Sequence, residues 1–317
     1  MTIFPPMSHT ENYQDLVIVD SDFESILTNP ILDIAARFWE EDRYQAFKVC
    51  YRSMREIDDL VDDRKVDGQT FSPAEQISYT ENINELIAGL VKTESGGRTQ
   101  RMLLEVIQRY EIPLWPWQRL ARAMIYDIKN DGFDSFMAFR RYTEGAAISP
   151  ASVFMHLCGI SQSAQELGLP KFDICKAARP LAIFSYLVHI MRDYEKDQTR
   201  NLNYFPNDFL TRHNLKPSEI QSLCKSSIVD DRVRSLFNEY KRLADYYRKR
   251  ALKSVNDTIP YLKPKYQLSL KLVYSLYLQI FDKIDCENGS FSTAELNPTP
   301  AEVQEKIDFT VKNFKAV

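Results

Sequence analysis

Apolar residues recur at helical spacing along most of this chain, and this periodicity constrains its fold more than any other feature. Dipeptides that contain proline interrupt this periodicity, for example Ile112-Pro113, Leu169-Pro170 and Asn297-Pro298. No convincing β-hairpin signal separates the apolar segments. The pattern predicts helices near residues 33–63, 74–92, 98–110, 115–129, 134–157, 174–197, 231–256, 264–284 and 301–315.

We expect residues 1–317 to form one all-α domain. A chain of 317 residues suits one large domain as well as two average ones. No internal repeat, low-complexity tract or linker-like change of composition divides it. Residues 1–30 are expected to be a less ordered N-terminal segment. Because Val303, Ile307 and Val311 share one helical face, residues 301–315 are expected to dock as a terminal helix.

Charge and cysteine content exclude several classes of partner and site. The chain has 40 basic and 44 acidic residues and no run of five or more Lys or Arg, so nucleic acid is not expected as a partner. Its five cysteines are widely separated and never form CxxC, which argues against a disulfide framework and a zinc site. The first basic residue is Arg37, so the sequence predicts no export signal and a cytoplasmic location.

The first long helix carries four aspartates within six positions. A projection of about 100° per residue places Asp58 and Asp62 roughly 40° apart on its apolar side, whereas Asp59 and Asp63 project toward solvent. Two inward carboxylates lose their hydration, which is costly unless something positive meets them. The alternative interpretation is an acidic patch at a helix C-terminus that is neutralised by Arg52, Arg55 and Arg64.

A second inward pair is predicted in the helix over 174–197. Its longest apolar stretch, Leu181 to Met191, is too short to span a membrane and is expected to be buried. The same projection aligns Ala182, Tyr186, His189, Asp193 and Asp197 on one side of this helix, and the last four form a polar stripe. Two pairs of carboxylates on separate helices are easiest to explain if the helices face each other across a cavity.

Carboxylate oxygens are suitable ligands for Mg²⁺, which also favours phosphate oxygens. We therefore expect the two pairs to hold a diphosphate through two or three Mg²⁺ ions. Such ions assist cleavage of a carbon–oxygen bond by neutralising the leaving diphosphate. The resulting allylic carbocation would form in an aromatic-rich cavity, since the chain contains 18 Phe and 17 Tyr.

Several motifs in this order resemble the squalene and phytoene synthases, which join two isoprenoid diphosphates head to head. The matching segments are Tyr51-x3-Arg55-x2-Asp58-Asp59-x2-Asp62, Met124-x2-Asp127, Tyr142-x2-Gly145-Ala146-Ala147, Arg192-Asp193-x3-Asp197 with Asn203-Tyr204-Phe205-Pro206, and Tyr277 before Ile280 and Ile284. The resemblance implies the all-α isoprenoid synthase fold, in which helices surround a central cavity.

The resemblance also implies roles for the matched residues. Those implied to hold Mg²⁺ are Asp58, Asp62, Asp193 and Asp197. Those implied to contact or organise the diphosphates are Tyr51, Arg55 and Arg192. Tyrosines implied to face the reaction cavity are Tyr142 and Tyr277, and further substrate-binding positions are Tyr186, His189 and Tyr204. A kinked helix with small residues that leave room for prenyl tails is implied at Gly145, Ala146, Ala147 and Pro150.

The family reaction ionises one allylic diphosphate, alkylates it with a second and rearranges the product. It ends in deprotonation, or in reduction by NADPH for squalene-type products. No GxGxxG follows a predicted strand, so the sequence does not support a dinucleotide site of that kind. Apolar products that leave into a bilayer favour loose, peripheral membrane association. The sequence does not indicate an oligomeric state, a prenyl chain length or a product.

The chain departs from the family pattern around the second diphosphate site. Where the family usually has Ser-x-Ser-Phe, this chain has Asn29-Pro30-Ile31-Leu32. The family commonly has Gln and Asn at the positions of Tyr186 and His189, and Arg at that of Leu202. Two further hypotheses therefore stay open. One is a terpene synthase or diphosphate lyase that acts on one prenyl diphosphate, and the other is a non-enzymatic assembly protein on the same fold.

Overall fold

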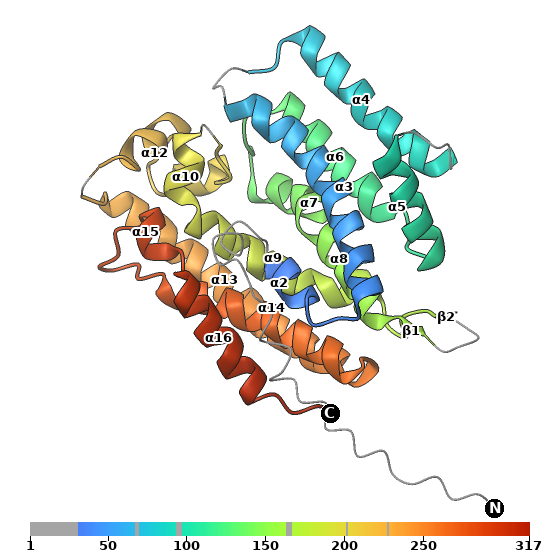
Figure 1. Cartoon of the computed structure of the whole chain (residues 1–317). Coiled ribbons are helices and arrows are strands. Elements are labelled where there is room, and N and C mark those ends of the chain that lie inside the picture. Colours follow the sequence, from blue (N-terminus) through green and yellow to red (C-terminus); the bar gives the residue numbers. More distant parts are fainter. Residues whose placement is uncertain (1–30, 67–69, 93–96, 163–166, 201, 227) are drawn as a thin grey trace, which may run out of the picture.

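The computed structural model describes residues 31–66, 70–92, 97–162, 167–200, 202–226 and 228–317 (Figure 1). The predicted all-α class is confirmed, because these residues contain only one pair of two-residue strands, β1 (Ser161–Gln162) and β2 (Leu167–Gly168). The N-terminal segment 1–30, for which less order was expected, lies outside the described residues. The helices are α2 (Ile31–Ala36), α3 (Glu41–Val66), α4 (Pro73–Lys92), α5 (Arg98–Arg109), α6 (Trp115–Lys129), α7 (Phe136–Ala146), α8 (Ile148–Gly159), α9 (Ile174–Arg192), α10 (Tyr194–Thr199), α11 (Asn207–Arg212), α12 (Pro217–Leu223), α13 (Asp231–Thr258), η2 (Ile259–Tyr261), α14 (Pro264–Lys283), α15 (Thr293–Leu296) and α16 (Pro300–Lys312).

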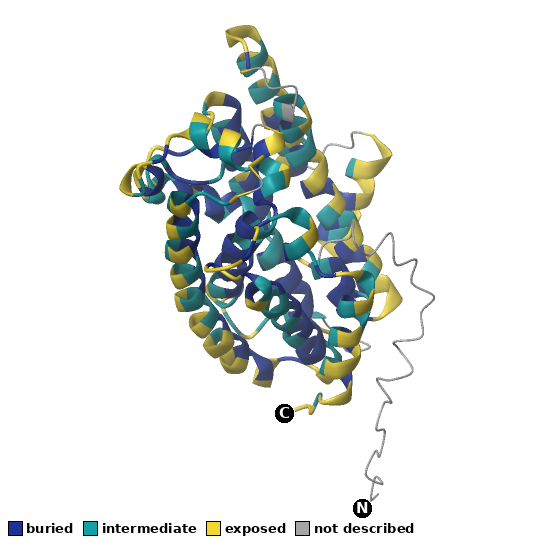
Figure 2. Ribbon diagram, turned by 90° about the vertical axis from the view of Figure 1, so that its left-hand side faces the viewer, coloured by how far each residue is buried: buried dark blue, intermediate teal, exposed yellow. Residues whose placement is uncertain are grey.

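Helix α9 lies at the centre of this arrangement and packs against α13, α8 and α14. Between Leu181 and Met191 every side chain except Tyr186 and His189 is buried, which confirms the prediction of a buried helix. In the described part of the chain, α9 alone is long and apolar enough to cross a membrane, but more than half of its apolar window is buried. Figure 2 shows that buried residues follow the inward faces of the helices. We therefore assign α9 to the core.

Helix α3 supplies one wall opposite α9. It packs against α5, α6 and α8 through an apolar face at helical spacing, formed by Phe47, Cys50, Met54, Ile57 and Val61. The first turn of α3 carries Glu41 and Asp42, and the last turn carries Arg64 and Lys65. These charges complement the partial charges of the helix ends, which stabilises the helix. Because its apolar face is buried, the carboxylates of α3 that lie next to this face turn inward.

Three of the helices were predicted as continuous, and the structure divides each of them into two. The helix expected over 33–63 is divided between α2 and α3, because Trp39 turns into the core and its indole N–H donates to Ser269 of α14 at 2.9 Å. The helix expected over 134–157 breaks at Ala147, since Pro150 lacks the N–H that would bond to the carbonyl of Ala146. The helix expected over 174–197 breaks at Asp193, whose φ and ψ of −93° and 10° leave the helical region.

Two smaller features complete the fold. Strands β1 and β2 pair antiparallel, with Ser161 opposite Gly168, and such two-residue strands carry too little pattern to be found in a sequence. Helix α16 packs on α14 and buries Val303, Ile307 and Val311 against it. Its N-terminus is stabilised by a capping box between Thr299 and Glu302.

Candidate active site

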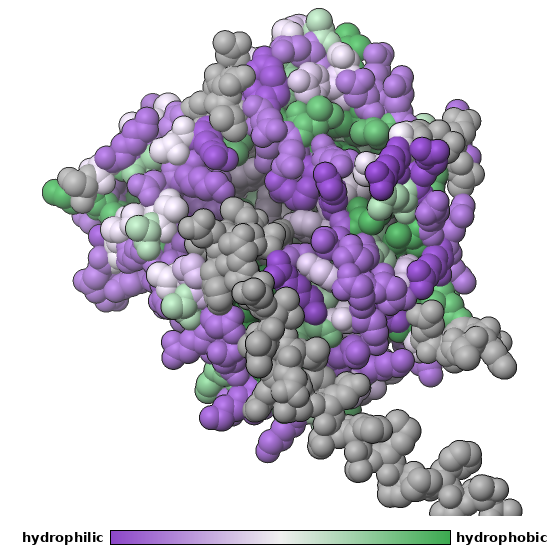
Figure 3. All heavy atoms as spheres, viewed as in Figure 1, coloured by the Kyte–Doolittle hydropathy of each residue, from purple (hydrophilic) through white to green (hydrophobic). Residues whose placement is uncertain are grey.

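A cavity of about 1030 Å³ runs between α3, α8, α9 and α14. One part of its wall is polar and carries the acidic and basic side chains of α3, α9 and α10. The other part is apolar and includes Ile31, Leu32, Val49, Phe154, Met155, Ala178, Leu181, Leu270 and Val273. By contrast, the outer face seen in Figure 3 is mostly hydrophilic. A cavity with a charged and an apolar region suits a ligand with an anionic head and a hydrocarbon tail.

The cavity gathers the residues that the sequence places at the site. Of the predicted site residues, only Gly145 does not line it. The residues that do are Tyr51, Arg55, Asp58, Asp62, Tyr142, Ala146, Ala147, Tyr186, His189, Arg192, Asp193, Asp197, Tyr204 and Tyr277. They come from segments that are far apart in the chain. Their chemical roles stay predictions.

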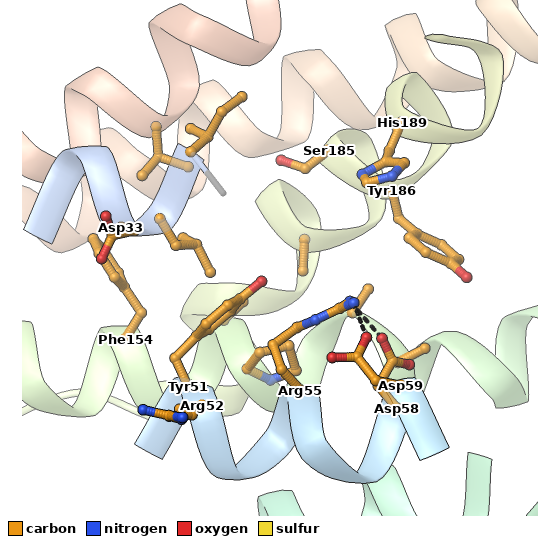
Figure 4. A pocket seen from close by; sticks show the side chains of 18 of the residues that line it. Asp33, Tyr51, Arg52, Arg55, Asp58, Asp59, Phe154, Ser185, Tyr186 and His189 are labelled. Carbon is orange, nitrogen blue, oxygen red and sulfur yellow. Dashed lines mark hydrogen bonds and ion pairs between the residues drawn. The ribbon is translucent and has the colours of Figure 1, made fainter. Parts of the chain in front are cut away.

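The two aspartates of α3 differ in how they are neutralised. Arg55 Nη1 lies 2.6 Å from Asp58 Oδ2, and the same guanidinium pairs with Asp59 (Figure 4). The side chain of Asp62 makes no hydrogen bond or ion pair with any described residue. Burial raises the pKa of Asp58, although Arg55 opposes this effect. Burial and the charges of Asp58 and Asp127 raise the pKa of Asp62. The unpartnered carboxylate is thus held in surroundings that disfavour its charge.

The pair on α9 and α10 shows the same difference. Arg192 binds the carboxylate of Asp193 through Nε at 2.7 Å and Nη2 at 2.9 Å. His189 Nε2 lies 2.8 Å from Asp193 Oδ2. Burial disfavours ionisation of Asp193, but His189 and Arg192 outweigh it and hold its pKa well below the usual range. The side chain of Asp197 makes no hydrogen bond or ion pair with a described residue, and burial together with the charge of Asp193 raises its pKa to about 7.

Each pair therefore holds one carboxylate neutralised by an arginine and one that is not. Unpartnered, desolvated carboxylates are costly unless a cation meets them, so the donor set fits a divalent metal ion. Among the described residues, no three His, Cys, Asp or Glu side chains form a complete metal cage by themselves. Mg²⁺ does not require one, because it usually binds one or two carboxylates together with water and substrate phosphates.

Five tyrosines line the cavity near these acids, and they come from different elements: Tyr51, Tyr142, Tyr186, Tyr204 and Tyr277. The ring centroid of Tyr186 lies 6.4 Å from that of Tyr142 and 6.3 Å from that of Tyr204. Burial raises the pKa of all five hydroxyls, which therefore stay protonated and act as hydrogen-bond donors. Their ring faces are electron-rich and favour a nearby cation.

A buried ion pair between α3 and α6, for which the sequence predicted no role, belongs to the same region as the α3 acids. Asp127 of α6 is 6% exposed, and Lys65 Nζ lies 3.2 Å from its Oδ1. Asp127 Oδ2 makes no hydrogen bond to a described residue. The charge of Asp127 contributes to the raised pKa values of Asp58 and Asp62, so it belongs to the same electrostatic cluster. The signal that could have found it is its position three residues after Met124 on the buried face of α6.

Gly145 was expected to leave room for a prenyl tail in the cavity. This expectation is wrong, because Gly145 faces α6 and does not line the cavity. A Cβ on Gly145 would lie 2.2 Å from the carbonyl oxygen of Arg119 and 2.6 Å from Cβ of Ala123, both on α6. The missing side chain therefore permits close packing of α7 on α6. The neighbours Ala146, Ala147 and Pro150 do line the cavity, and the implied kink is present beside them.

Replacement of Gly145 by Ala is expected to lower the free energy of unfolding by about 1–3 kcal/mol, because the backbone of α6 must move to admit a methyl group. Urea denaturation measures this change. The control is Gly97→Ala, where a Cβ would meet nothing within 4 Å. Because Gly97 is the N-cap of α5, a position at which Ala is less favourable than Gly, the stability should fall by no more than about 1 kcal/mol. Equal stability of wild type and Gly145→Ala would contradict the assignment.

The sequence of the chain matches the family model of squalene/phytoene synthase over residues 33–300. The chain belongs to the squalene/phytoene synthase family. It is 23% identical over 248 residues to phytoene synthase 1, chloroplastic, of Zea mays, covering 78% of this chain and 56% of that protein. It is also 23% identical over 247 residues to phytoene synthase, chloroplastic, of Narcissus pseudonarcissus, covering 78% of this chain and 54% of that protein.

Solved structures support the fold of this family member independently. A dehydrosqualene synthase in complex with ligand superposes with a TM-score of 0.66 at 15% identity, over 95% of this chain and 98% of that one. The family and the isoprenoid synthase fold that the motifs implied are thus confirmed. The chain spans about half the length of the curated relatives it matches, so the activity and substrates of this family member are matters of proposal.

Proposed function

We propose that this squalene/phytoene synthase family member is a Mg²⁺-dependent prenyltransferase that condenses two allylic isoprenoid diphosphates head to head. The observation that carries the proposal is the pair of unpartnered carboxylates, Asp62 and Asp197, on opposite walls of one cavity. They lie beside arginines and next to an apolar region. This arrangement supports a substrate with a diphosphate head and a prenyl tail.

Different residues of the polar wall would bind the metal ions, bind the diphosphate and stabilise the cation. Asp58, Asp62, Asp193 and Asp197 would hold Mg²⁺, which when bound neutralises the leaving diphosphate. Arg55 and Arg192 carry fixed positive charge beside these acids and would orient diphosphate oxygens. The protonated tyrosines would donate hydrogen bonds and present ring faces to an allylic cation. The apolar wall would exclude water from that cation.

A second candidate function uses the same site on one prenyl diphosphate, as a terpene synthase or diphosphate lyase does. The specific observation in its favour is that Ile31, at the position of the second Ser of Ser-x-Ser-Phe, lines the cavity with an apolar side chain. Asn29 and Pro30 of that segment lie outside the described residues. Loss of the hydroxyl at the position of Ile31 weakens support for a second diphosphate. A squalene- or phytoene-type product contains the carbons of two substrates, so product mass separates the two candidates.

Incubation with farnesyl or geranylgeranyl diphosphate and Mg²⁺ tests the proposal. We expect release of inorganic diphosphate and a product formed from two prenyl units, both abolished by EDTA and restored by added Mg²⁺. Isothermal titration with an unreactive diphosphate analogue should show binding only when Mg²⁺ is present. If neither substrate loses its diphosphate and no Mg²⁺-dependent binding is found, the proposal is wrong.

A further inference from the structure

Ser185 of α9 is a polar residue in an otherwise apolar stretch of the cavity wall. It is 8% exposed, and its Oγ has no hydrogen-bond partner among the described residues. Four other buried side-chain atoms share this property in the described part of the chain, but none of their residues lines the cavity. A buried hydroxyl without a partner costs free energy relative to an apolar side chain. Ser185 therefore needs an explanation that involves the cavity.

Other buried hydroxyls in this protein satisfy themselves within their helix. Ser152 of α8 donates to the carbonyl oxygen of Ile148 at 2.7 Å, and Thr258 donates to that of Ser254 at 2.7 Å. Ser185 makes no such bond to the residue four positions earlier. A serine has one side-chain torsion whose staggered states are close in energy. In this structure the Oγ of Ser185 is shielded from solvent, so it would meet a small polar group in the cavity after rotation about this torsion.

A second polar atom lies on the same face of α9. His189 follows Ser185 by four residues, so the two side chains are neighbours on one face. His189 Nε2 lies against Asp193 and Arg192, whereas Nδ1 makes no hydrogen bond to a described residue. In Figure 4 both residues project from the segment of α9 that crosses the cavity. An ordered water needs two or more polar partners, and this pair provides them.

Apolar side chains line the cavity together with Ser185. Leu181 lies one turn before it on α9, and Leu270 and Val273 of α14 line the same cavity. These side chains offer no hydrogen bonds, so a water in this region depends on Ser185 and its neighbour. Such a water would lie in the space where the proposed function places the prenyl tail and its cation. Water at that place is a nucleophile, because an allylic cation reacts with any accessible lone pair.

We infer that Ser185 positions a water molecule that captures the allylic cation, so that this protein releases a prenyl alcohol as a product. The inference rests on the proposed function, since it requires ionisation of the diphosphate. The carbon–oxygen bond to the diphosphate breaks, and the diphosphate leaves with both electrons. The water oxygen then forms a new bond to the cationic carbon, and its surplus proton passes to the released diphosphate. No oxidant or reductant is needed, and the co-reactant is water.

The experiment follows oxygen-18 from water into product. The full chain is incubated with farnesyl diphosphate and Mg²⁺ in oxygen-18 water, and released diphosphate and organic products are quantified. We expect an alcohol two mass units heavier than the unlabelled compound. Cleavage of the phosphorus–oxygen bond by a phosphatase would leave the alcohol unlabelled and would overturn the inference. Diphosphate release with only hydrocarbon products would also overturn it while the proposed function stands. Without diphosphate release, both would be wrong.

Variants of Ser185 show whether this residue positions the water. In Ser185→Ala the labelled alcohol should fall at least about tenfold as a share of product, while diphosphate release changes less than about threefold. Ser185→Thr keeps the hydroxyl and should retain the labelled alcohol. The matched control is Ser152→Ala, which removes a buried helical hydroxyl away from the cavity and should leave the product ratio unchanged. An unchanged alcohol share in Ser185→Ala would contradict the role of Ser185.

Discussion

Replacement of Asp62 by Asn is expected to lower turnover of a prenyl diphosphate by at least about 10³-fold without unfolding the protein. Asp62 has no partner among the described residues, so its carboxylate is available to a metal ion. Asn keeps the size of the side chain but removes the charge that attracts Mg²⁺. Initial rates of diphosphate release, measured at saturating substrate and Mg²⁺, give the loss directly.

The same substitution should stabilise the protein in the absence of ligand. A carboxylate that contributed to stability would instead destabilise the protein when replaced, so the sign of the change distinguishes a functional acid from a structural one. Burial and two neighbouring carboxylates raise the pKa of Asp62, so its charge is unfavourable in the folded state. We expect Tm of Asp62→Asn at pH 8 to rise by roughly 1–3 °C.

The control for Asp62→Asn is Glu56→Gln, which neutralises an exposed acid of the same helix that does not line the cavity. It should change neither turnover nor Tm appreciably. Activity of Asp62→Asn within tenfold of wild type would contradict the assigned role. It would favour the non-enzymatic assembly protein if the wild type were also inactive.

Binding of a diphosphate analogue with Mg²⁺ is expected to weaken by about 50-fold between pH 7 and pH 5 through Asp197 alone. Metal ligands must be ionised, and burial with the charge of Asp193 raises the pKa of Asp197 to about 7. About half of these carboxylates are ionised at pH 7 and about one in a hundred at pH 5. Isothermal titration at several pH values measures the change.

The stability of the unliganded protein should depend on pH in the opposite sense. An unfolded chain releases the proton of an aspartate near pH 4, whereas folded Asp197 keeps it up to about pH 7. The folded state therefore binds more protons in this interval, and the free energy of unfolding falls as the pH rises through it. Asp197→Asn removes this contribution of Asp197 to both pH profiles. Identical profiles in wild type and Asp197→Asn would show that another group controls binding.

The arrangement of the acids followed from helical periodicity. Asp58 and Asp62 recur on the apolar face of one helix, and Asp193 and Asp197 continue the polar stripe of another. An apolar face must be buried, so these carboxylates had to turn inward, and the cavity does collect them. The three breaks in the predicted helices did not disturb this result. Two of them lie outside the acid pairs, and at the third, Asp193, helix α10 follows at once, so that Asp193 and Asp197 still line the same cavity.

Contacts between distant segments could not be obtained in this way. A missing side chain at Gly145 looks the same in a sequence whether it faces a cavity or another helix, and only the distance to Arg119 shows that it faces α6. Likewise, Lys65 and Asp127 are 62 residues apart, so nothing local to either position marks their ion pair. Trp39 breaks a helix for the same kind of reason, through a bond to Ser269.

The sequence by itself determined the helical class, the family and the identity of the inward carboxylates, because these depend on spacing within single helices and on motifs along the chain. The tertiary structure alone decided that Asp62 and Asp197 are left unpartnered and that Ser185 lacks a hydrogen bond. The physical reason is that charge neutralisation and hydrogen bonding depend on distances of a few ångströms between groups from different helices, and such distances exist only after the helices have packed.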